Sequence, residues 1–160
     1  MTLHKTKIDI ASAKREKIVA ILNSRLADAA DLKSQAKQAH WNVKGMNFIA
    51  LHELFDQVAT EVETHIDDIA ERITTLGGTA LGTVRMASAA STLAEYPAEI
   101  TDGADHVDAL SSALADFGKK VRAAIDETDE LGDADTADLF TGVSRAVDKD
   151  LWFVESHLEK

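Results

Sequence analysis

The sequence has no cysteine, only one proline and only eight glycines among 160 residues. Without cysteine, disulfides, iron–sulfur clusters and thiolate zinc sites are excluded, so any metal must be held by oxygen and imidazole ligands. Aromatic residues make up only 5% of the chain. Because a β-sandwich or β-barrel needs many turns and many aromatic or β-branched positions, this composition disfavours an all-β fold.

Basic residues are also scarce. The chain has 17 Lys and Arg against 28 Asp and Glu, a formal net charge of −11. This balance disfavours a general nucleic-acid binder and suits cations. No stretch approaches the roughly 18 apolar residues of a membrane span, and no apolar segment of a secretory signal follows the first seven residues. We therefore expect a cytoplasmic protein with one domain over residues 1–160.

Four apolar stripes with helical spacing predict helices at about 18–43, 47–76, 107–125 and 136–158. The acidic segment 126–135 is expected to break the third helix, and Asp135 or Thr136 to cap the fourth. Residues 1–8 form a short N-terminal tail. The long connection 77–101 lets the second and third helices run parallel, which predicts an all-α, ferritin-like four-helix bundle.

A row of polar side chains lies within about 100° of arc on one side of the predicted helix 47–76. The spacing i, i+4 lets neighbours in this row share a cation, and a divalent ion would offset the cost of burying carboxylates. The alternative is a solvated helix face. His40, on the apolar stripe of the first helix, joins the row or is an ordinary core histidine. The row consists of His52, Asp56, Glu63, Asp67 and Glu71.

The pairs His52/Asp56 and Asp67/Glu71 are about 22 Å apart along one helix, so one chain cannot bring them to the same metal. The third and fourth helices lack the Glu-x-x-His motif of di-iron bundles. In a two-fold dimer, the two 47–76 helices could cross antiparallel near residue 61 or 62. The His52/Asp56 pair of each chain would then face the Asp67/Glu71 pair of the other, and symmetry would make two equal sites. Two imidazoles and three carboxylates suit Fe(II), and less well Mn(II) or Zn(II).

Several segments resemble the Dps family, the mini-ferritins called DNA-binding proteins from starved cells. They are KQAHWNVKG at 37–45, NF at 47–48, HE at 52–53, AER at 70–72, LGG at 76–78 and AVDKDLWF at 146–153. The resemblance covers essentially the whole chain. It implies a hollow homododecamer that oxidises Fe(II), preferably with hydrogen peroxide, and stores the Fe(III) product. The ligands it implies are His40, His52 and Asp56 of one subunit and Asp67 and Glu71 of its two-fold mate.

The resemblance also suggests roles around the iron site. Trp41 and Trp152 would intercept stray oxidising equivalents, or simply fill an interface. Glu53 would help nucleate mineral on the inner surface, or be an ordinary solvated residue. Glu63 is interpreted as a polar partner at the dimer contact, and His65 as a residue that supports the ligands or faces solvent.

The acidic segment that separates the last two helices has two interpretations. It is either a solvated loop with a helix cap, or a negatively charged pore at a three-fold axis that guides Fe(II) inward, as in the family. In the second case, the candidates for the iron-entry pore are Asp129, Asp133 and Asp138.

Two other functions compete with iron oxidation. A nucleoid-associated, DNA-compacting protein would use basic residues near the N-terminus, as some family members do with a lysine-rich tail. Twelve chains at −11 each total about −132, a charge that repels phosphates and disfavours this reading. A purely structural oligomer is disfavoured by the intact ligand positions. The basic residues in question are Lys5, Lys7, Lys14, Arg15 and Lys17.

Overall fold

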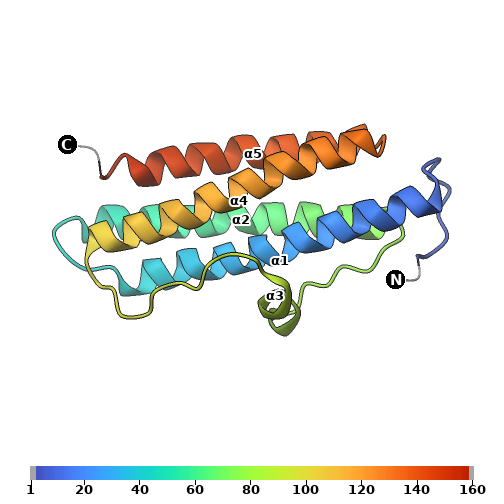
Figure 1. The fold of residues 1–160 in the computed structure, drawn as a ribbon. Helices are drawn as coiled ribbons and strands as arrows, with labels where there is room; N and C mark the ends of the chain where they lie inside the picture. Colours follow the sequence, from blue (N-terminus) through green and yellow to red (C-terminus); the bar gives the residue numbers. More distant parts are fainter. Residues whose placement is uncertain (1–2, 159–160) are drawn as a thin grey trace.

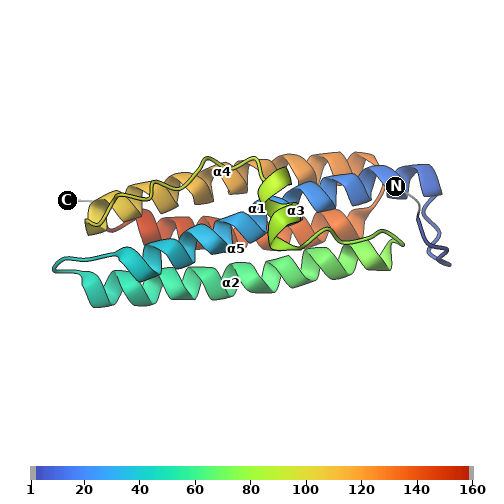
Figure 2. The same ribbon diagram turned by 90° about the horizontal axis from the view of Figure 1, so that it is seen from below.

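Five helices make up most of residues 3–158, the part of the chain that the computed structural model describes. They are α1 (Ser12–Asn42), α2 (Phe48–Thr75), α3 (Val84–Ala90), α4 (Gly103–Glu130) and α5 (Ala134–Glu155). The four long helices lie side by side, and short α3 stands out beside α1 (Figures 1 and 2). Residues 3–158 contain no β-strand, only one isolated bridge between Lys44 and Asp102.

The connection between α2 and α4 returns along the bundle, so α2 and α4 run parallel (Figure 1). Side chains of α1 hold this crossover. Asn23 donates to the carbonyl of Thr79 at 3.1 Å and accepts from the amide of Leu81 at 2.9 Å. Asp28 accepts from the amide of Thr92 at 2.7 Å. The predicted ferritin-like topology is therefore confirmed, with α3 as a helical piece inside the crossover.

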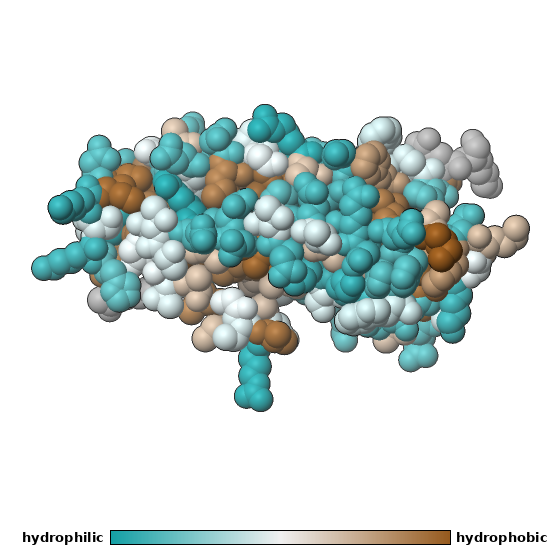
Figure 3. Space-filling view, turned by 180° about the vertical axis from the view of Figure 1, so that it is seen from behind, coloured by the Kyte–Doolittle hydropathy of each residue, from teal (hydrophilic) through white to brown (hydrophobic). Residues whose placement is uncertain are grey.

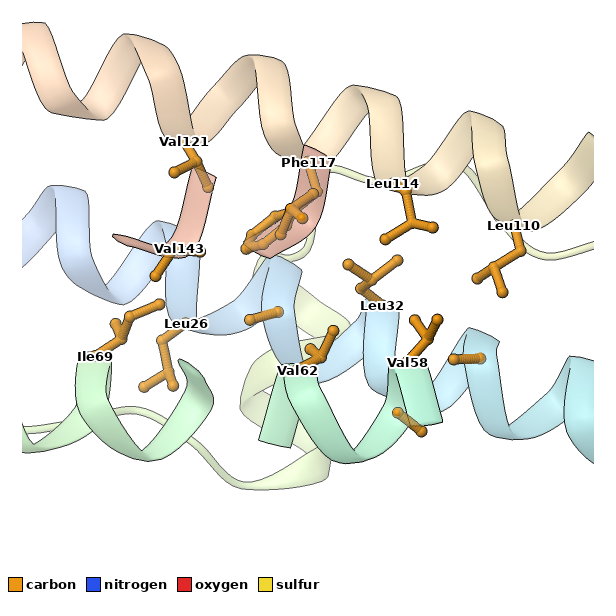
Figure 4. Close-up of a cluster of buried hydrophobic side chains, with 14 of the residues drawn as sticks. Leu26, Leu32, Val58, Val62, Ile69, Leu110, Leu114, Phe117, Val121 and Val143 are labelled. Atoms are coloured by element: carbon orange, nitrogen blue, oxygen red, sulfur yellow. The ribbon is translucent and has the colours of Figure 1, made fainter. Parts of the chain in front are cut away.

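The core lies between the four long helices, where the apolar stripes meet (Figure 4). Each fully buried large apolar side chain contributes about 1.5–3 kcal/mol to folding, so the side chains of this core dominate the stability of the bundle. Along residues 3–158, no helix combines the length and apolar character needed to cross a lipid bilayer. Core residues drawn in Figure 4 are Leu26, Leu32, Val58, Val62, Ile69, Leu110, Leu114, Phe117, Val121 and Val143.

Helix α2 has the predicted bounds, with Asn47 before it and Leu76 after it. Helix α1 begins at Ser12, earlier than its apolar stripe indicates. The added turn contains Arg15, which is buried and donates to the carbonyls of Ile10 at 3.0 Å and Leu76 at 2.7 Å. The hydrogen bond to Leu76 connects the start of α1 to the end of α2 through polar groups alone.

The acidic segment separates the last two helices at 131–133, but two details differ from expectation. Helix α4 extends into the segment as far as Glu130, and the buried Thr128 in this extension donates its hydroxyl to the carbonyl of Ala124 at 2.7 Å. The cap of α5 is Asp133, not Asp135 or Thr136: its carboxylate accepts from the amide of Thr136 at 3.2 Å and from the hydroxyl of the same residue. The break between the two helices therefore falls inside the predicted segment 126–135, whereas the predicted cap is wrong.

Candidate metal centre

Two histidines face each other where α1 ends and α2 begins. Nδ1 of His40 lies 2.7 Å from the main-chain carbonyl of His52, and Nδ1 of His52 lies 2.8 Å from that of His40. The two rings stack with centroids 3.7 Å apart. Because a carbonyl only accepts, each Nδ1 carries the proton and donates it. Each Nε2 is therefore left with a free lone pair, the state in which a histidine binds a metal.

Asp56 follows His52 by one turn of α2 and is ion-paired with Lys37 of α1, Nζ to Oδ1 at 2.5 Å. The hydrogen bond from Lys37 is the main cause that lowers the pKa of Asp56, and the nearby His40 and His52 act in the same direction. The carboxylate is therefore ionised and able to bind a metal cation, but it is already paired with the ammonium group of Lys37. Lys37 is absent from the predicted site because its spacing does not mark it as a partner of Asp56.

Asp67 and Glu71 are exposed near the other end of α2. Helix α2 is unbroken over 28 residues, so the two ligand pairs stay about 22 Å apart in the chain. Within residues 3–158, no three His, Asp or Glu side chains converge to hold a metal. A single chain thus presents two separate, incomplete halves of the predicted ligand set, and their meeting across a dimer stays a prediction.

An open depression on α2 contains the first half of the predicted ligand set together with Glu53. The face over α2 is mainly hydrophilic (Figure 3). Glu63 is ion-paired with Lys33 of α1, so it has a partner within its own chain. The depression is lined by His40, His52, Glu53, Asp56, Gln57, Thr60, Glu61 and Thr64.

Two buried polar atoms flank this face without a hydrogen-bond partner in residues 3–158: Nε2 of His65 and Oδ2 of Asp150 on α5. Burial lowers the pKa of His65. Burial raises the pKa of Asp150 to about 6, and the carboxylate of Glu61 adds to the effect. Asp150 is absent from the predicted site, although its helical spacing from Val147 and Val154 places it on the buried face of α5 and is the signal that could have marked it.

Both tryptophans are exposed in the single chain, Trp41 at 66% and Trp152 at 59%. Trp41 follows His40, and Nζ of Lys37 lies 5.7 Å from its ring centroid, so this indole is next to the ion pair of Asp56. Trp152 packs on Phe153 with ring centroids 4.9 Å apart. Interface filling and interception of oxidants both stay predictions for these rings.

The pore candidates separate into two kinds. Asp129 and Asp138 are exposed and free to line a channel. Asp133 is only 2% exposed and, besides capping α5, accepts from Arg72 of α2 at 2.7 Å. Its carboxylate holds α2 and α5 together, so in this chain Asp133, unlike Asp129 and Asp138, is not free to line a channel.

Comparison with known proteins agrees with this architecture. A ferritin-like domain matches residues 19–160. The DNA protection during starvation protein of Agrobacterium fabrum (strain C58) is 47% identical over 160 residues, covering 100% of this chain and 99% of that protein. The structure of DpsA14 from Streptomyces coelicolor superposes with a TM-score of 0.94 at 34% identity, covering 100% and 95% of the two chains. Dps from Microbacterium arborescens in the high iron form gives 0.87 at 33% identity, covering 94% and 97%.

The parallel α2 and α4, the long crossover and the paired histidines and carboxylates define a ferritin-like helical bundle. Within that class, the chain belongs to the Dps family. Iron storage and protection under stress are the general functions of this family.

Proposed function

We propose that the chain is a ferroxidase that oxidises Fe(II), preferably with hydrogen peroxide, at two-fold interfaces and stores the product in a homododecameric cage. The observation that carries the proposal is the reciprocal hydrogen bonding of His40 and His52, which leaves both Nε2 atoms free next to ionised Asp56. Iron is the substrate and the cargo. A solved relative, Dps from Microbacterium arborescens, is described in a high iron form.

The partner chain would complete each site with the Asp67 and Glu71 that a single chain holds too far away. Two imidazoles and three carboxylates then surround Fe(II) and stabilise the charge that rises as Fe(III) forms. Two Fe(II) ions give one electron each to one hydrogen peroxide, whose O–O bond breaks to form two hydroxide ions. Because peroxide takes both electrons at one site, no hydroxyl radical is released, and the cell is protected.

Storage of iron and its entry into the cage both depend on the assembled oligomer. Exposed Asp129 and Asp138 are the remaining candidates for a negatively charged iron-entry pore at a three-fold axis, and exposed Glu53 for nucleating mineral. Gel filtration with light scattering tests the cage directly: we expect a mass near twelve times 17.3 kDa. A dimer as the largest species would contradict the cage.

The ferroxidase test follows Fe(II) oxidation by absorbance after peroxide is added, in the native chain and in a double variant, His40→Ala with Asp67→Ala. We expect the variant to fall to the rate of iron in buffer, because both halves of each site lose a ligand. Asp68→Asn is the matched control, since it neutralises the exposed neighbour of Asp67 on the same helix. Equal rates in the native chain and the double variant would refute the ferroxidase.

DNA compaction has less support than iron oxidation. Of the basic residues near the N-terminus, Arg15 is buried and donates to main-chain carbonyls, so it is not available to phosphates. The net charge of −11 repels DNA. A gel-shift assay at low salt, with residues 1–7 deleted as control, tests this: we expect no retention of plasmid by either protein, and retention by the intact protein alone would instead place it at the nucleoid.

A further inference from the structure

The chain contains a single tyrosine, and it is bonded to a buried histidine. Tyr96, in the crossover between α3 and α4, places its hydroxyl 2.6 Å from Nδ1 of His106 on α4. The two rings are nearly parallel, with centroids 6.0 Å apart. His106 is only 1% exposed and Tyr96 is half-buried. No step of the proposed iron oxidation uses either residue.

The direction of this hydrogen bond follows from the protons that the two groups carry. Burial lowers the pKa of His106, so the ring is neutral at pH 7 and carries one proton. Because Nδ1 is the ring atom that meets the protonated hydroxyl of Tyr96, we assign the ring proton to Nε2, which has no hydrogen-bond partner in residues 3–158. Nδ1 therefore accepts, and the Tyr96 hydroxyl donates. Burial also raises the pKa of Tyr96, so the phenol keeps its proton at any physiological pH.

Phe55 connects this pair to the stretch of α2 that carries candidate metal ligands. The ring of His106 lies 6.5 Å, centroid to centroid, from that of Phe55 on α2. Phe55 is fully buried, directly precedes Asp56, and lies one helical turn after His52. The ring contacts from Tyr96 through His106 to Phe55 bring the pair to the stretch of α2 that carries His52 and Asp56, a short route for an electron.

We propose that Tyr96 and His106 form a redox pair that gives one electron to strong one-electron oxidants of the hydroxyl-radical class formed at the iron site. This inference rests on the proposed ferroxidase function, since such oxidants form when peroxide meets a single Fe(II). The O–H bond of Tyr96 breaks, the electron reduces the hydroxyl radical to hydroxide, and the proton moves to Nδ1 of His106. The products are a neutral tyrosyl radical and an imidazolium, so no cation radical forms on the phenol.

The experiment loads the assembled protein with one Fe(II) per chain, adds hydrogen peroxide, and freezes samples at successive times for EPR while absorbance follows iron oxidation. We expect a tyrosyl signal that narrows when the protein is made with ring-deuterated tyrosine. Tyr96→Phe keeps the ring and loses the signal completely, with an unchanged rate of iron oxidation. His106→Gln removes the proton acceptor and lowers the radical yield several-fold. Trp41→Phe is the matched aromatic control and keeps the tyrosyl signal.

The outcomes separate this inference from the function on which it rests. Normal iron oxidation without a tyrosyl signal at any freezing time overturns the redox pair alone, and so does a signal that survives Tyr96→Phe. Iron oxidation no faster than in buffer overturns both. Should His106→Gln fail to assemble, the deuterated native protein and Tyr96→Phe, which leaves the core packing in place, still decide the matter.

Discussion

His40 and His52 hold each other in place, because each ring donates from Nδ1 to the main-chain carbonyl of the other, at 2.7 and 2.8 Å. Neither ring can turn without losing its hydrogen bond and the stacking contact. The end of α1 and the beginning of α2 are therefore joined by two of the proposed metal ligands. Both Nε2 atoms are positioned before any metal arrives, which removes part of the ordering cost of binding.

Lys37 is expected to weaken metal binding, because an arriving cation must displace its ammonium from Asp56. Lys37→Gln removes the competing charge, so we expect several-fold tighter binding of Co(II), an analogue of Fe(II) that peroxide does not consume, measured by calorimetry. Lys33→Gln is the matched control, since it frees Glu63, a carboxylate outside the five ligands. Weaker binding by Lys37→Gln than by the native chain would show that this lysine assists the site.

Asp133 is expected to matter for stability, whereas the exposed acids around it matter for iron entry. Asp133→Asn weakens the cap of α5 and leaves Arg72 without its buried partner, so we expect a loss of roughly 2–4 kcal/mol in the free energy of unfolding. Asp138→Asn, at an exposed position of the same helix, should leave stability unchanged and slow iron uptake. Chemical denaturation and uptake kinetics measure the two effects; the reverse pattern would restore Asp133 to the pore.

Asp150 should make the fold less stable as the pH rises. Its folded pKa, about 6, lies above the ordinary value of 3.8, so its favourable contribution is complete below about pH 4 and is lost as the pH rises through 6. Asp150→Asn removes the buried charge while keeping the shape. We expect the variant to gain about 2–3 kcal/mol over the native chain at pH 8 and nothing at pH 4. An equal difference at both pH values would mean that Asp150 does not titrate in this range.

The sequence predicts the bundle well because its signal is repetitive: each apolar stripe repeats the helical period many times, and Asn47 and Leu76 mark the ends of α2 as expected. It predicts poorly where one polar residue decides the structure. Within the acidic segment, the cap of α5 is the buried Asp133, which also pairs with Arg72 of α2, and not Asp135 or Thr136. Arg15 extends α1 through hydrogen bonds to carbonyls, which leave no periodic pattern.

The candidate site shows the same division. The spacing of the carboxylates along α2 predicts that one chain holds two incomplete halves, and the structure has them apart. The contacts around those halves come from other elements: Lys37 of α1 pairs with Asp56, and His106 of α4 lies against Phe55, the residue before Asp56. Such pairs depend on packing angles between helices, and a single sequence contains no periodicity that reports them.

The proposed division of each site between two chains predicts complementation between two inactive variants. One chain carries His52→Ala and Asp56→Asn, and the other carries Asp67→Asn and Glu71→Gln. Each variant alone should oxidise Fe(II) no faster than buffer, because every site in its assembly lacks one half. The two chains are then unfolded together and reassembled, so that mixed dimers form. Circular dichroism and gel filtration of each parent confirm that it folds.

In a mixed dimer, one site receives both defective halves and the other receives both intact halves, so one of the two sites recovers full function. With random pairing, half of the dimers are mixed, and about a quarter of all sites should regain activity. Mixing the two assembled proteins without unfolding is the control and should stay inactive. If each site were formed by a single chain, neither protocol would restore activity, because neither variant chain holds a complete ligand set. That result would refute the shared site without bearing on the fold.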